Sequence, residues 1–300
     1  GWHRGVYPIG PLHVTAGEPL GLYQFSTVLD SRERVIVYPQ IYPLAQLSLP
    51  SDLSVGQVRT ASHIHPDPTR IAGVRSYQAG DTWRSIHWKA SARLGELQVK
   101  QYDHTLMVDV EILLNLDERE YSVHSFLPDS ELAIAVAASL GSYFTDRNIS
   151  FGLVINGGAE EAAKSDPAAD SPGLALPSDA KGNDGSCLRL PHRKGREHLM
   201  LVLEALAAAR CQPALDFPTL VLEETARCSW GATVLLITPL DSDELVANCL
   251  RLVRSGYKVI IIVVGEKLRH RELLFRPAGD SLQMYHIMPH NLQHQSLALG

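Results

Sequence analysis

The sequence predicts an α/β protein: an N-terminal antiparallel β-domain, partial and sandwich-like, followed by a Rossmann-type doubly wound sheet. Two observations lead to this fold class. The first 60 residues hold short β-branched runs between Gly and Pro turns, and from about residue 106 apolar strands alternate with helical patterns. We expect a partial β-rich domain over 1–60, a linking segment over 61–105 and an α/β domain over 106–300, with a flexible insertion at about 157–187.

The composition is that of a globular protein, with 45% hydrophobic and 20% charged residues. A net charge of -6 argues against non-specific nucleic-acid binding, which needs a basic surface. The four cysteines form no CxxC pair, so a zinc ribbon or a disulfide framework is not indicated. The longest aliphatic run, 259–264, is far too short to span a membrane.

Three short β-branched or aromatic runs predict the strands of the N-terminal sheet. They lie at 6–7, 13–15 and 35–38, and turns with Gly or Pro separate them. This spacing favours hairpin connections, and therefore an antiparallel arrangement.

Nearly continuous apolar runs predict the strands of the second sheet, because a strand that is buried on both faces has no polar alternation. They lie at 110–116, 149–155, 232–238, 257–264 and 284–288. Helical patterns stand between them, so the connections are expected to be right-handed crossovers between parallel strands.

Helix starts are marked by capping residues. Asp129 or Ser130 is expected to cap a helix with apolar residues every four positions over 132–144, and Pro218 is expected to begin another. Asp241 and Glu244 have the spacing of a capping box.

A further helix end is marked by Gly256, which is expected just past the last turn. The stretch of about 157–187 has no apolar period and is rich in Gly, Ala, Ser, Pro and Asp, which predicts a flexible insertion.

The segment 73–103 is the densest in specific residue types. We expect a helix that follows Asp81, carries Trp83, Ile86 and Ala90 on one stripe, and ends at Gly95. The residues that we single out as structural or interacting are Arg75, Tyr77, Gly80, Asp81, Arg84, Trp88, Lys89 and Arg93.

Two roles are open for these cations and indoles. They could bind an anion or the acidic surface of a partner. Alternatively, cation–π contacts and Arg–carboxylate pairs that use Asp81 and Glu96 could clamp the β-domain to the α/β domain. We favour the clamp, because the mixed cations, indoles and carboxylates can satisfy one another.

This segment resembles the signature of the bacterial and archaeal family called domain of unknown function 58. Blocks at 4–7 and 18–22 are similar to two further motifs of that family. The resemblance implies a C-terminal half similar to the von Willebrand factor A domain. It also implies two transmembrane helices upstream of the chain, and genomic neighbours that encode MoxR-type AAA+ ATPases and transglutaminase-like membrane proteins.

A von Willebrand A domain binds a divalent metal through Asp-x-Ser-x-Ser after its first strand, plus a Thr and an Asp from later loops. The corresponding positions here are Asn115, Asp117 and Arg119, with Thr238 and Asp241 as remnants of the other ligands. A cation in place of a hydroxyl repels a metal ion, so we expect a degenerate site without metal and no cofactor.

The residues offer weak support for catalysis. Cys187 and His192 lie close in sequence, but a nucleophile pair needs a third orienting group, and none is visible beside them. His63, His65 and Asp67 alternate on a Pro-containing loop, a pattern more typical of solvated side chains than of metal ligands. We therefore assign no catalytic residue.

The function that we expect is a non-enzymatic interaction module or scaffold that works with a MoxR-type ATPase. The protein would be anchored in the cell membrane, with this part facing the cytoplasm. The alternatives are a hydrolase with a site at the carboxyl end of the sheet and a metal-dependent adhesion module. A pocket of titratable side chains at that end would favour the enzyme.

Overall fold

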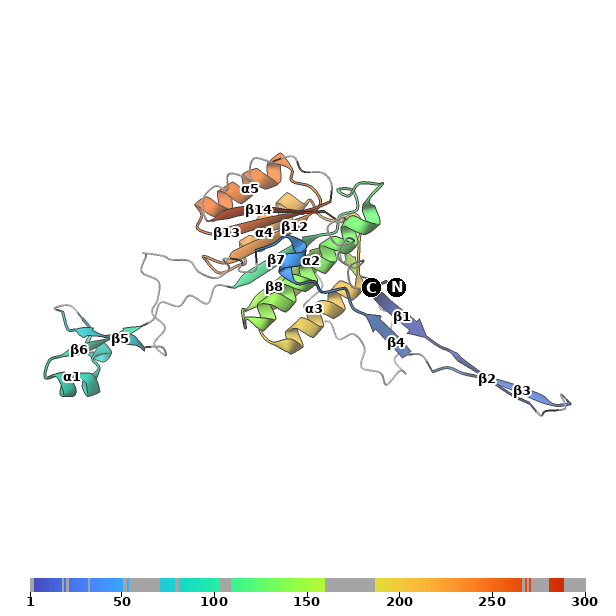
Figure 1. Ribbon diagram of the computed structural model, residues 1–300, viewed down its shortest axis with the longest axis horizontal. Coiled ribbons are helices and arrows are strands. Elements are labelled where there is room, and N and C mark those ends of the chain that lie inside the picture. Colours follow the sequence, from blue (N-terminus) through green and yellow to red (C-terminus); the bar gives the residue numbers. More distant parts are fainter. Residues whose placement is uncertain are drawn as a thin grey trace. The chain divides into compact units, whose positions relative to one another are not determined.

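The computed structural model divides into two compact units (Figure 1). Residues 1–55 and 108–300 form one, the α/β unit, and 56–107 form the other, the signature unit. The structure describes residues 3–17, 19, 22–31, 33–50, 53, 71–78, 81–102, 109–159, 187–265, 268, 270 and 281–288.

A six-stranded sheet forms the centre of the α/β unit, in the order β10-β8-β7-β12-β13-β14. All neighbours are parallel except β10, which is antiparallel to β8 at the edge. Counted along the chain, the order is that of a doubly wound Rossmann sheet. The strands are β7 (Val110–Asn115), β8 (Phe151–Asn156), β10 (Cys187–Arg193), β12 (Thr233–Thr238), β13 (Lys258–Val264) and β14 (Leu282–Ile287).

The predicted parallel strands are thus confirmed, whereas β10 was not predicted. Two-residue strands β9 (Gly158–Ala159) and β11 (Ala209–Arg210) pair beside the sheet. Most of the predicted insertion, 160–186, lies outside the described residues.

Helices cover both faces of the sheet. α2 (Phe126–Asp146) and α3 (Arg196–Ala208) pack on one face and share its core with Ile112, Leu114 and their neighbours (Figure 1). On the opposite face, α4 (Phe217–Thr225) and α5 (Asp243–Arg254) pack on Leu113 and Leu236. Alternate residues of one strand therefore enter two different cores, as a strand buried on both faces requires.

Two predicted helix caps are wrong by a short distance. Helix α2 begins at Phe126 after Ser125, so Asp129 lies in its first turn and accepts a hydrogen bond from Ser125 Oγ at 2.5 Å. Helix α5 is capped by Ser242, whose Oγ accepts from the backbone N–H of Leu245 at 3.2 Å. Ser, Asp and Thr cap helices about equally well, so neighbouring candidates cannot be ranked from sequence.

Other predicted helix ends are confirmed. Pro218 stands in the first turn of α4, behind the cap Asp216. Gly256 follows α5 with a φ of 92°, a left-handed conformation that glycine adopts without strain.

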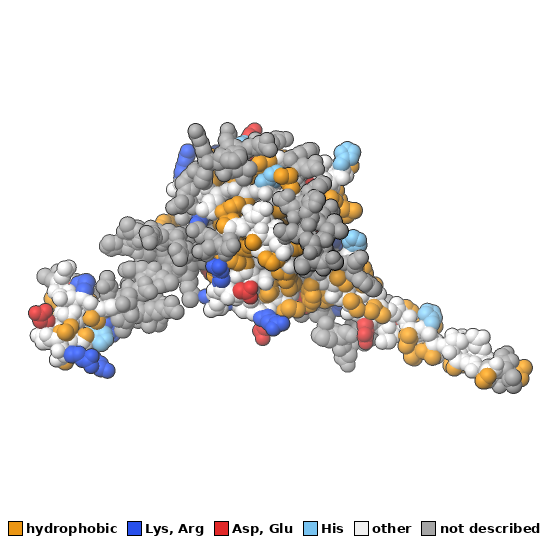
Figure 2. Space-filling model, in the orientation of Figure 1, with side chains coloured by type: hydrophobic (Ala, Val, Ile, Leu, Met, Phe, Trp, Pro, Cys, Tyr) orange, Lys and Arg blue, Asp and Glu red, His pale blue; other side chains and the backbone are white. Residues whose placement is uncertain are grey.

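The predicted N-terminal strands form antiparallel two-stranded ribbons, and the described residues contain no sandwich. The first ribbon pairs β1 (Gly5–Ile9) with β4 (Glu33–Val37), and the second pairs β2 (Leu12–Gly17) with β3 (Gln24–Leu29). Hydrophobic side chains lie exposed along the ribbons, among them Leu12, Phe25 and Val28 (Figure 2). Without a second layer to cover them, these strands have no core of their own.

The segment after β4 packs against the α/β core. The 3-10 helix η1 (Leu44–Leu47) places Leu47 in the same hydrophobic cluster as α2. Ser139 on α2 accepts a hydrogen bond from the backbone N–H of Tyr42 at 2.9 Å. The expected separate domain over 1–60 differs from this arrangement, because its last leucines supply part of the α/β core.

The signature unit is a hairpin with two short helices between its strands. β5 (Ile71–Ser76) pairs antiparallel with β6 (Gln98–Tyr102), and η2 (Trp83–Ser85) and α1 (Trp88–Leu94) lie between them. The α-helix starts later than a cap at Asp81 predicts, because Ile86 is extended and bridges to Val99. The predicted end at Gly95 is confirmed by its φ of 75°.

Among the helices that the structure describes, none has both the length and the apolar composition needed to cross a lipid bilayer.

Candidate functional site

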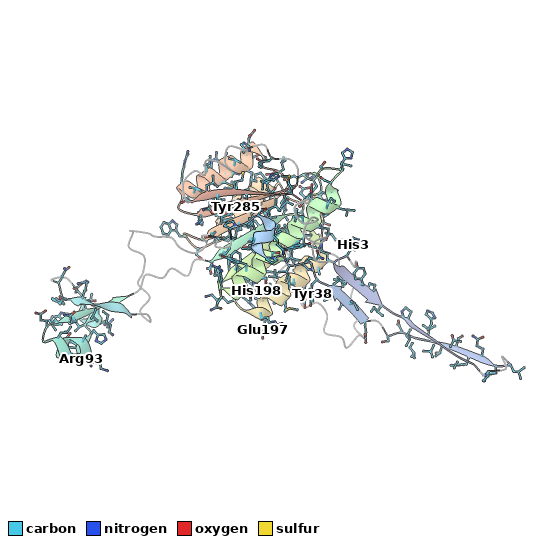
Figure 3. All side chains as sticks on the ribbon, viewed as in Figure 1. His3, Tyr38, Arg93, Glu197, His198 and Tyr285 are labelled. Atoms are coloured by element: carbon cyan, nitrogen blue, oxygen red, sulfur yellow. The ribbon has the colours of Figure 1, made fainter. Side chains whose placement is uncertain are left out.

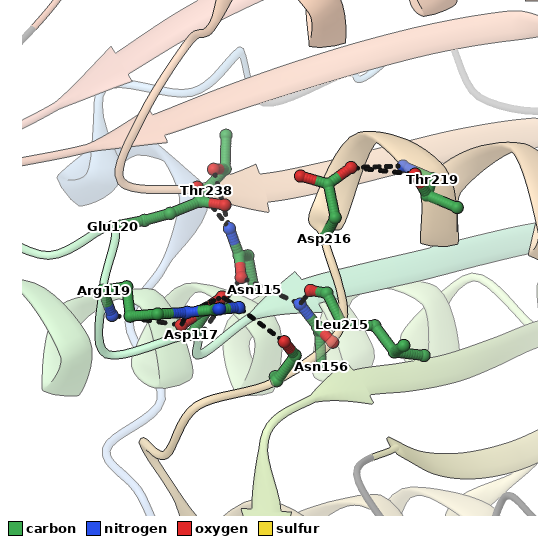
Figure 4. Close-up of polar contacts among 10 residues, drawn as sticks. Asn115, Asp117, Arg119, Glu120, Asn156, Leu215, Asp216, Thr219 and Thr238 are labelled. Atoms are coloured by element: carbon green, nitrogen blue, oxygen red, sulfur yellow. Dashed lines mark hydrogen bonds and ion pairs between the residues drawn. The ribbon is translucent and has the colours of Figure 1, made fainter. Parts of the chain in front are cut away.

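The strand order reverses between β7 and β12, and in open α/β sheets ligands bind outside the carboxyl ends of the strands at that point. Polar side chains gather there in this chain (Figure 4). They come from the ends of β7, β8 and β12 and from the loop after β7. The central ones are Asn115, Asp117, Glu120, Asn156 and Thr238.

Asn115 connects these groups, because its buried amide hydrogen-bonds on every side. Its Oδ1 accepts from the backbone N–H of Asp117 at 3.1 Å and from Asn156 Nδ2 at 3.2 Å. Its Nδ2 donates to Glu120 Oε2 at 2.8 Å and to Thr238 Oγ1 at 3.3 Å. An aspartate in this place would lose both donated bonds and would face a second carboxylate.

Asp117 is paired with Arg119 (Figure 4). The Arg119 Nε lies 2.9 Å from Asp117 Oδ1, and a terminal nitrogen lies 2.5 Å from Oδ2. The same guanidinium donates to the carbonyl of Ala214 at 2.6 Å, and its bonds to the carboxylate raise the pKa of Arg119. The charge of the buried carboxylate is therefore matched within the chain itself.

The remaining predicted positions, Thr238 and Asp241, have different hydrogen-bond partners. Thr238 joins the network, where its Oγ1 also accepts from the backbone N–H of Leu240 at 3.3 Å. Asp241 is buried and accepts from the backbone N–H of His270 at 2.6 Å, with His270 Nδ1 3.2 Å from the same oxygen.

Sequence reasoning missed Glu120 and Asn156. Burial raises the pKa of Glu120 to about 7, the hydrogen bond from Asn115 opposes this shift, and the charges of Asp117 and Asp216 add to it. A polar residue at the carboxyl end of a predicted parallel strand was the signal that could have identified Asn156.

The cavity at this end of the sheet is small. It measures about 30 Å³, and Glu120, Ser125, Asp129 and Gly265 contribute to its lining. That volume suits a single water molecule and is about a tenth of a typical small-molecule site.

The described residues contain no group of three or more His, Cys, Asp or Glu side chains with the arrangement of a metal site. At the switch point, Arg119 binds the carboxylate of Asp117 and Asn115 uses both sides of its amide. The absence of a bound metal stays a prediction.

Asp81 orders the turn of the signature unit. Its carboxylate binds Arg75 through two contacts of 2.8 and 2.6 Å and accepts from the backbone N–H of Gln78 at 2.9 Å. The hydrogen bond from Arg75 is the largest cause of the lowered pKa of Asp81. The ring of Tyr77 lies 6.2 Å from that of Trp83, at the edge of the same turn.

The other predicted side chains of this unit are exposed. Arg84 lies on η2, and Trp88, Lys89 and Arg93 lie on α1, with Arg93 directed outward (Figure 3). Within the described part of the unit, these cations form no cation–π contact with either indole. Gly80 lies outside the described residues, and the clamp between domains stays a prediction.

The weaker candidates do not form catalytic pairs. Burial raises the pKa of the Cys187 thiol to about 11, and His192, five residues further along β10, contacts Glu111 instead. All four cysteines are free. His63, His65 and Asp67 lie outside the described residues.

The sequence model of the family described as protein of unknown function DUF58 matches residues 73–172, which include the signature segment and the first strand–helix–strand of the sheet. Residues 73–172, about a third of the chain, are therefore similar to the DUF58 family. The matched residues include Arg75 and the rest of the signature segment, whereas the blocks at 4–7 and 18–22 lie outside the match.

A curated relative of this chain is the uncharacterized protein YeaD of Bacillus subtilis (strain 168), which is 24% identical over 266 residues. The match covers 88% of this chain and 57% of the relative, so the chain spans little more than half of that protein. A solved structure, an aerotolerance-related membrane protein from Bacteroides fragilis NCTC 9343 with multiple mutations to serines, is 15% identical. It covers 63% of this chain and 96% of its own, with a TM-score of 0.35.

Proposed function

We propose that this chain is a member of the DUF58 family and a non-enzymatic protein–protein interaction module whose signature unit docks on an acidic protein partner. The observation that carries the proposal is the exposure of two tryptophans among cations. Trp83 is 69% exposed and Trp88 64% exposed, and Arg84, Lys89 and Arg93 lie beside them in sequence.

Exposed indoles on a small unit are unfavourable unless a partner covers them. Tryptophan and arginine are also the residues that most often dominate binding energy at protein interfaces. Leu94 and Leu97 are exposed on the same unit and add apolar area.

Charge supports an acidic partner. Residues 71–102 hold five Lys or Arg and two Asp or Glu, whereas the whole chain carries a net charge of -6. A basic patch of this kind attracts an acidic surface and speeds association, and salt weakens that effect.

The alternative of a hydrolase has one supporting observation, the pKa of about 7 at Glu120, which suits a general acid or base. The cavity that the described residues form beside this carboxyl argues against it, because about 30 Å³ is far below the volume of a typical small-molecule site. We therefore place the network at the switch point in a structural role.

The family resemblance supports finer proposals about context. The α/β unit would be von Willebrand A-like, and the doubly wound strand order is compatible with that. The acidic partner would be a MoxR-type AAA+ ATPase, with transglutaminase-like membrane proteins as further components. The full protein would be held at the membrane, with this part in the cytoplasm.

The test is direct binding between the purified chain and a MoxR-type AAA+ ATPase of the same organism, measured by calorimetry at two salt concentrations. We expect Trp83→Ala with Trp88→Ala to weaken binding at least about tenfold, since hot-spot residues each cost about 2 kcal/mol or more. The matched control is Trp230→Ala, because Trp230 is exposed in the other unit. Equal losses from both changes, or no binding by the unaltered chain, would overturn the proposal.

A further inference from the structure

A second polar cavity lies at the opposite end of the sheet. It measures about 280 Å³ and lies between α4 and the edge strand β10. Glu111, the second residue of β7, contributes to its lining, so it lies about 13 Å along the strand from Asn115. This volume is close to the lower limit for small-molecule sites.

Each of the two glutamates at this cavity lies beside a basic side chain of the chain. His192 Nε2 lies 2.9 Å from Glu111 Oε2, and the charge and hydrogen bond of Glu111 raise the pKa of His192 against the opposing effect of burial. Arg189 binds Glu224 Oε1 at 2.8 Å. The charge of Arg189 offsets that of Glu224, so this pair adds no net charge to the cavity.

Two further arginines line the cavity, Arg193 and Arg227, and neither has a carboxylate to itself. The side chain of Arg193 is exposed and makes no ion pair or hydrogen bond within the described residues. Arg227 reaches Glu224 only at 3.4 Å, on an oxygen that Arg189 already holds, and its side chain is 63% exposed. The cavity lining therefore holds three arginines against two glutamates.

The side chain of the buried Glu111 occupies space beside Gly152 that a larger residue would fill. A Cβ at Gly152 would lie 3.0 Å from both carboxylate oxygens of Glu111 and 3.2 Å from His192 Cδ2. Glu111 Oε1 has no hydrogen-bond partner among the described residues. A buried carboxylate with one unpaired oxygen is costly to stability, which favours a role beyond packing.

The rest of the lining is apolar or unreactive. Val154, Leu190 and Pro191 provide hydrocarbon surface. Burial raises the pKa of the Cys228 thiol to about 12, so its thiolate is scarce at neutral pH. The site is therefore suited to binding rather than to covalent chemistry.

We propose that this cavity binds a small organic anion, with its carboxylate or phosphate group on Arg193 and Arg227 and its apolar part against Val154 and Pro191. The site is independent of the docking surface on the signature unit, because every residue in it belongs to the α/β unit.

The experiment measures binding of benzoate, phenyl phosphate and inorganic phosphate to the full chain by calorimetry and by nuclear magnetic resonance at low salt. We expect saturable binding of at least one aromatic anion with a dissociation constant of about millimolar. Benzoate and phenyl phosphate distinguish a carboxylate from a phosphate ligand. Neutral benzamide should bind at least about tenfold more weakly than benzoate, because it lacks the charge that the two arginines recognise.

Variants separate the two arginines from the general charge of the chain. Arg193→Gln with Arg227→Gln should weaken binding of the aromatic anions about 100-fold, roughly tenfold for each guanidinium that is removed. Arg254→Gln, on the exposed side of α5, is the matched control and should leave affinity unchanged. Both altered arginines are exposed, so the fold should persist and circular dichroism can check it.

Three results would overturn the proposal: no saturable binding of any aromatic anion, equal affinity of the double variant and the unaltered chain, or benzamide binding as tightly as benzoate. If inorganic phosphate bound as tightly as phenyl phosphate, the apolar part of the proposal would be wrong.

Discussion

Arg119 holds the carboxylate of Asp117, two residues before it, through Nε at 2.9 Å and a terminal nitrogen at 2.5 Å. The pair occupies the end of the central strand where a divalent ion would need free oxygen ligands. The guanidinium cannot lose its proton in a protein, so Asp117 has a permanently charged partner.

The first prediction concerns metal binding. Millimolar Mg²⁺ or Mn²⁺ should not raise the melting temperature relative to chelator, because a ligand that binds the folded state must stabilise it. Asn115→Asp with Arg119→Ser would supply a second carboxylate and a hydroxyl, and this variant should show a saturable rise. A rise in the unaltered chain that Asp117→Ala abolishes would contradict the prediction.

The second prediction concerns pH. The folded chain keeps a proton on Glu120 up to a pH of about 7, whereas the unfolded chain releases it near the ordinary pKa of 4.5. The stability that this proton contributes is present below pH 4.5 and is lost as the pH rises through 7.

Replacing Glu120 by Gln keeps the acceptor for Asn115 and removes this titration. We expect the variant to match the unaltered chain at pH 5 and to exceed it at pH 8 by about 1–2 kcal/mol, a value reduced for partial exposure of the side chain. Urea unfolding at both pH values measures it, with the exposed Glu118→Gln as control. A constant difference across pH would show that Glu120 does not titrate as described.

The third prediction concerns the segment after β4. Leu47 is completely buried in the core that α2 lines, so Leu47→Ala should lower the free energy of unfolding of the α/β unit by about 2–5 kcal/mol. Leu22 is 81% exposed, and Leu22→Ala should change it by less than about 0.5 kcal/mol. Similar effects of the two changes would mean that residues 42–53 do not belong to this core.

The fourth prediction separates packing from surface within the signature unit. Ile86 is buried and bridges to Val99, so Ile86→Ala should speed amide hydrogen exchange across β5 and β6, consistent with a loss of about 2–5 kcal/mol. Trp88 is exposed on α1, and Trp88→Ala should leave that exchange unchanged. Fast exchange in both variants would show that Trp88 supports the fold rather than a docking surface.

Sequence patterns located the central strands well because burial on both faces favours a nearly continuous apolar run, and β7, β12 and β13 have one. The edge strand β10 was not predicted because its residues are only partly buried, and because it carries Arg189, Pro191 and His192. A strand with these residues looks like a loop when it is considered alone.

The candidate site divides in the same way. Asn115, Asp117, Arg119 and Thr238 could be named in advance, because each follows or ends a recognisable strand. Glu120 could not, since its importance depends on burial and on a hydrogen bond from Asn115.

The sequence by itself determined the kind of elements, the resemblance to a family and the residues at the end of the central strand, because propensity and apolar period act over a few neighbouring residues. Only the tertiary structure decided which distant groups meet. Asn115 binds Thr238, 123 positions away, because β7 and β12 are neighbours in the sheet. Glu111 contacts His192 because only β8 separates β7 from β10. That order results from packing the whole sheet between its helices, and no local pattern encodes it.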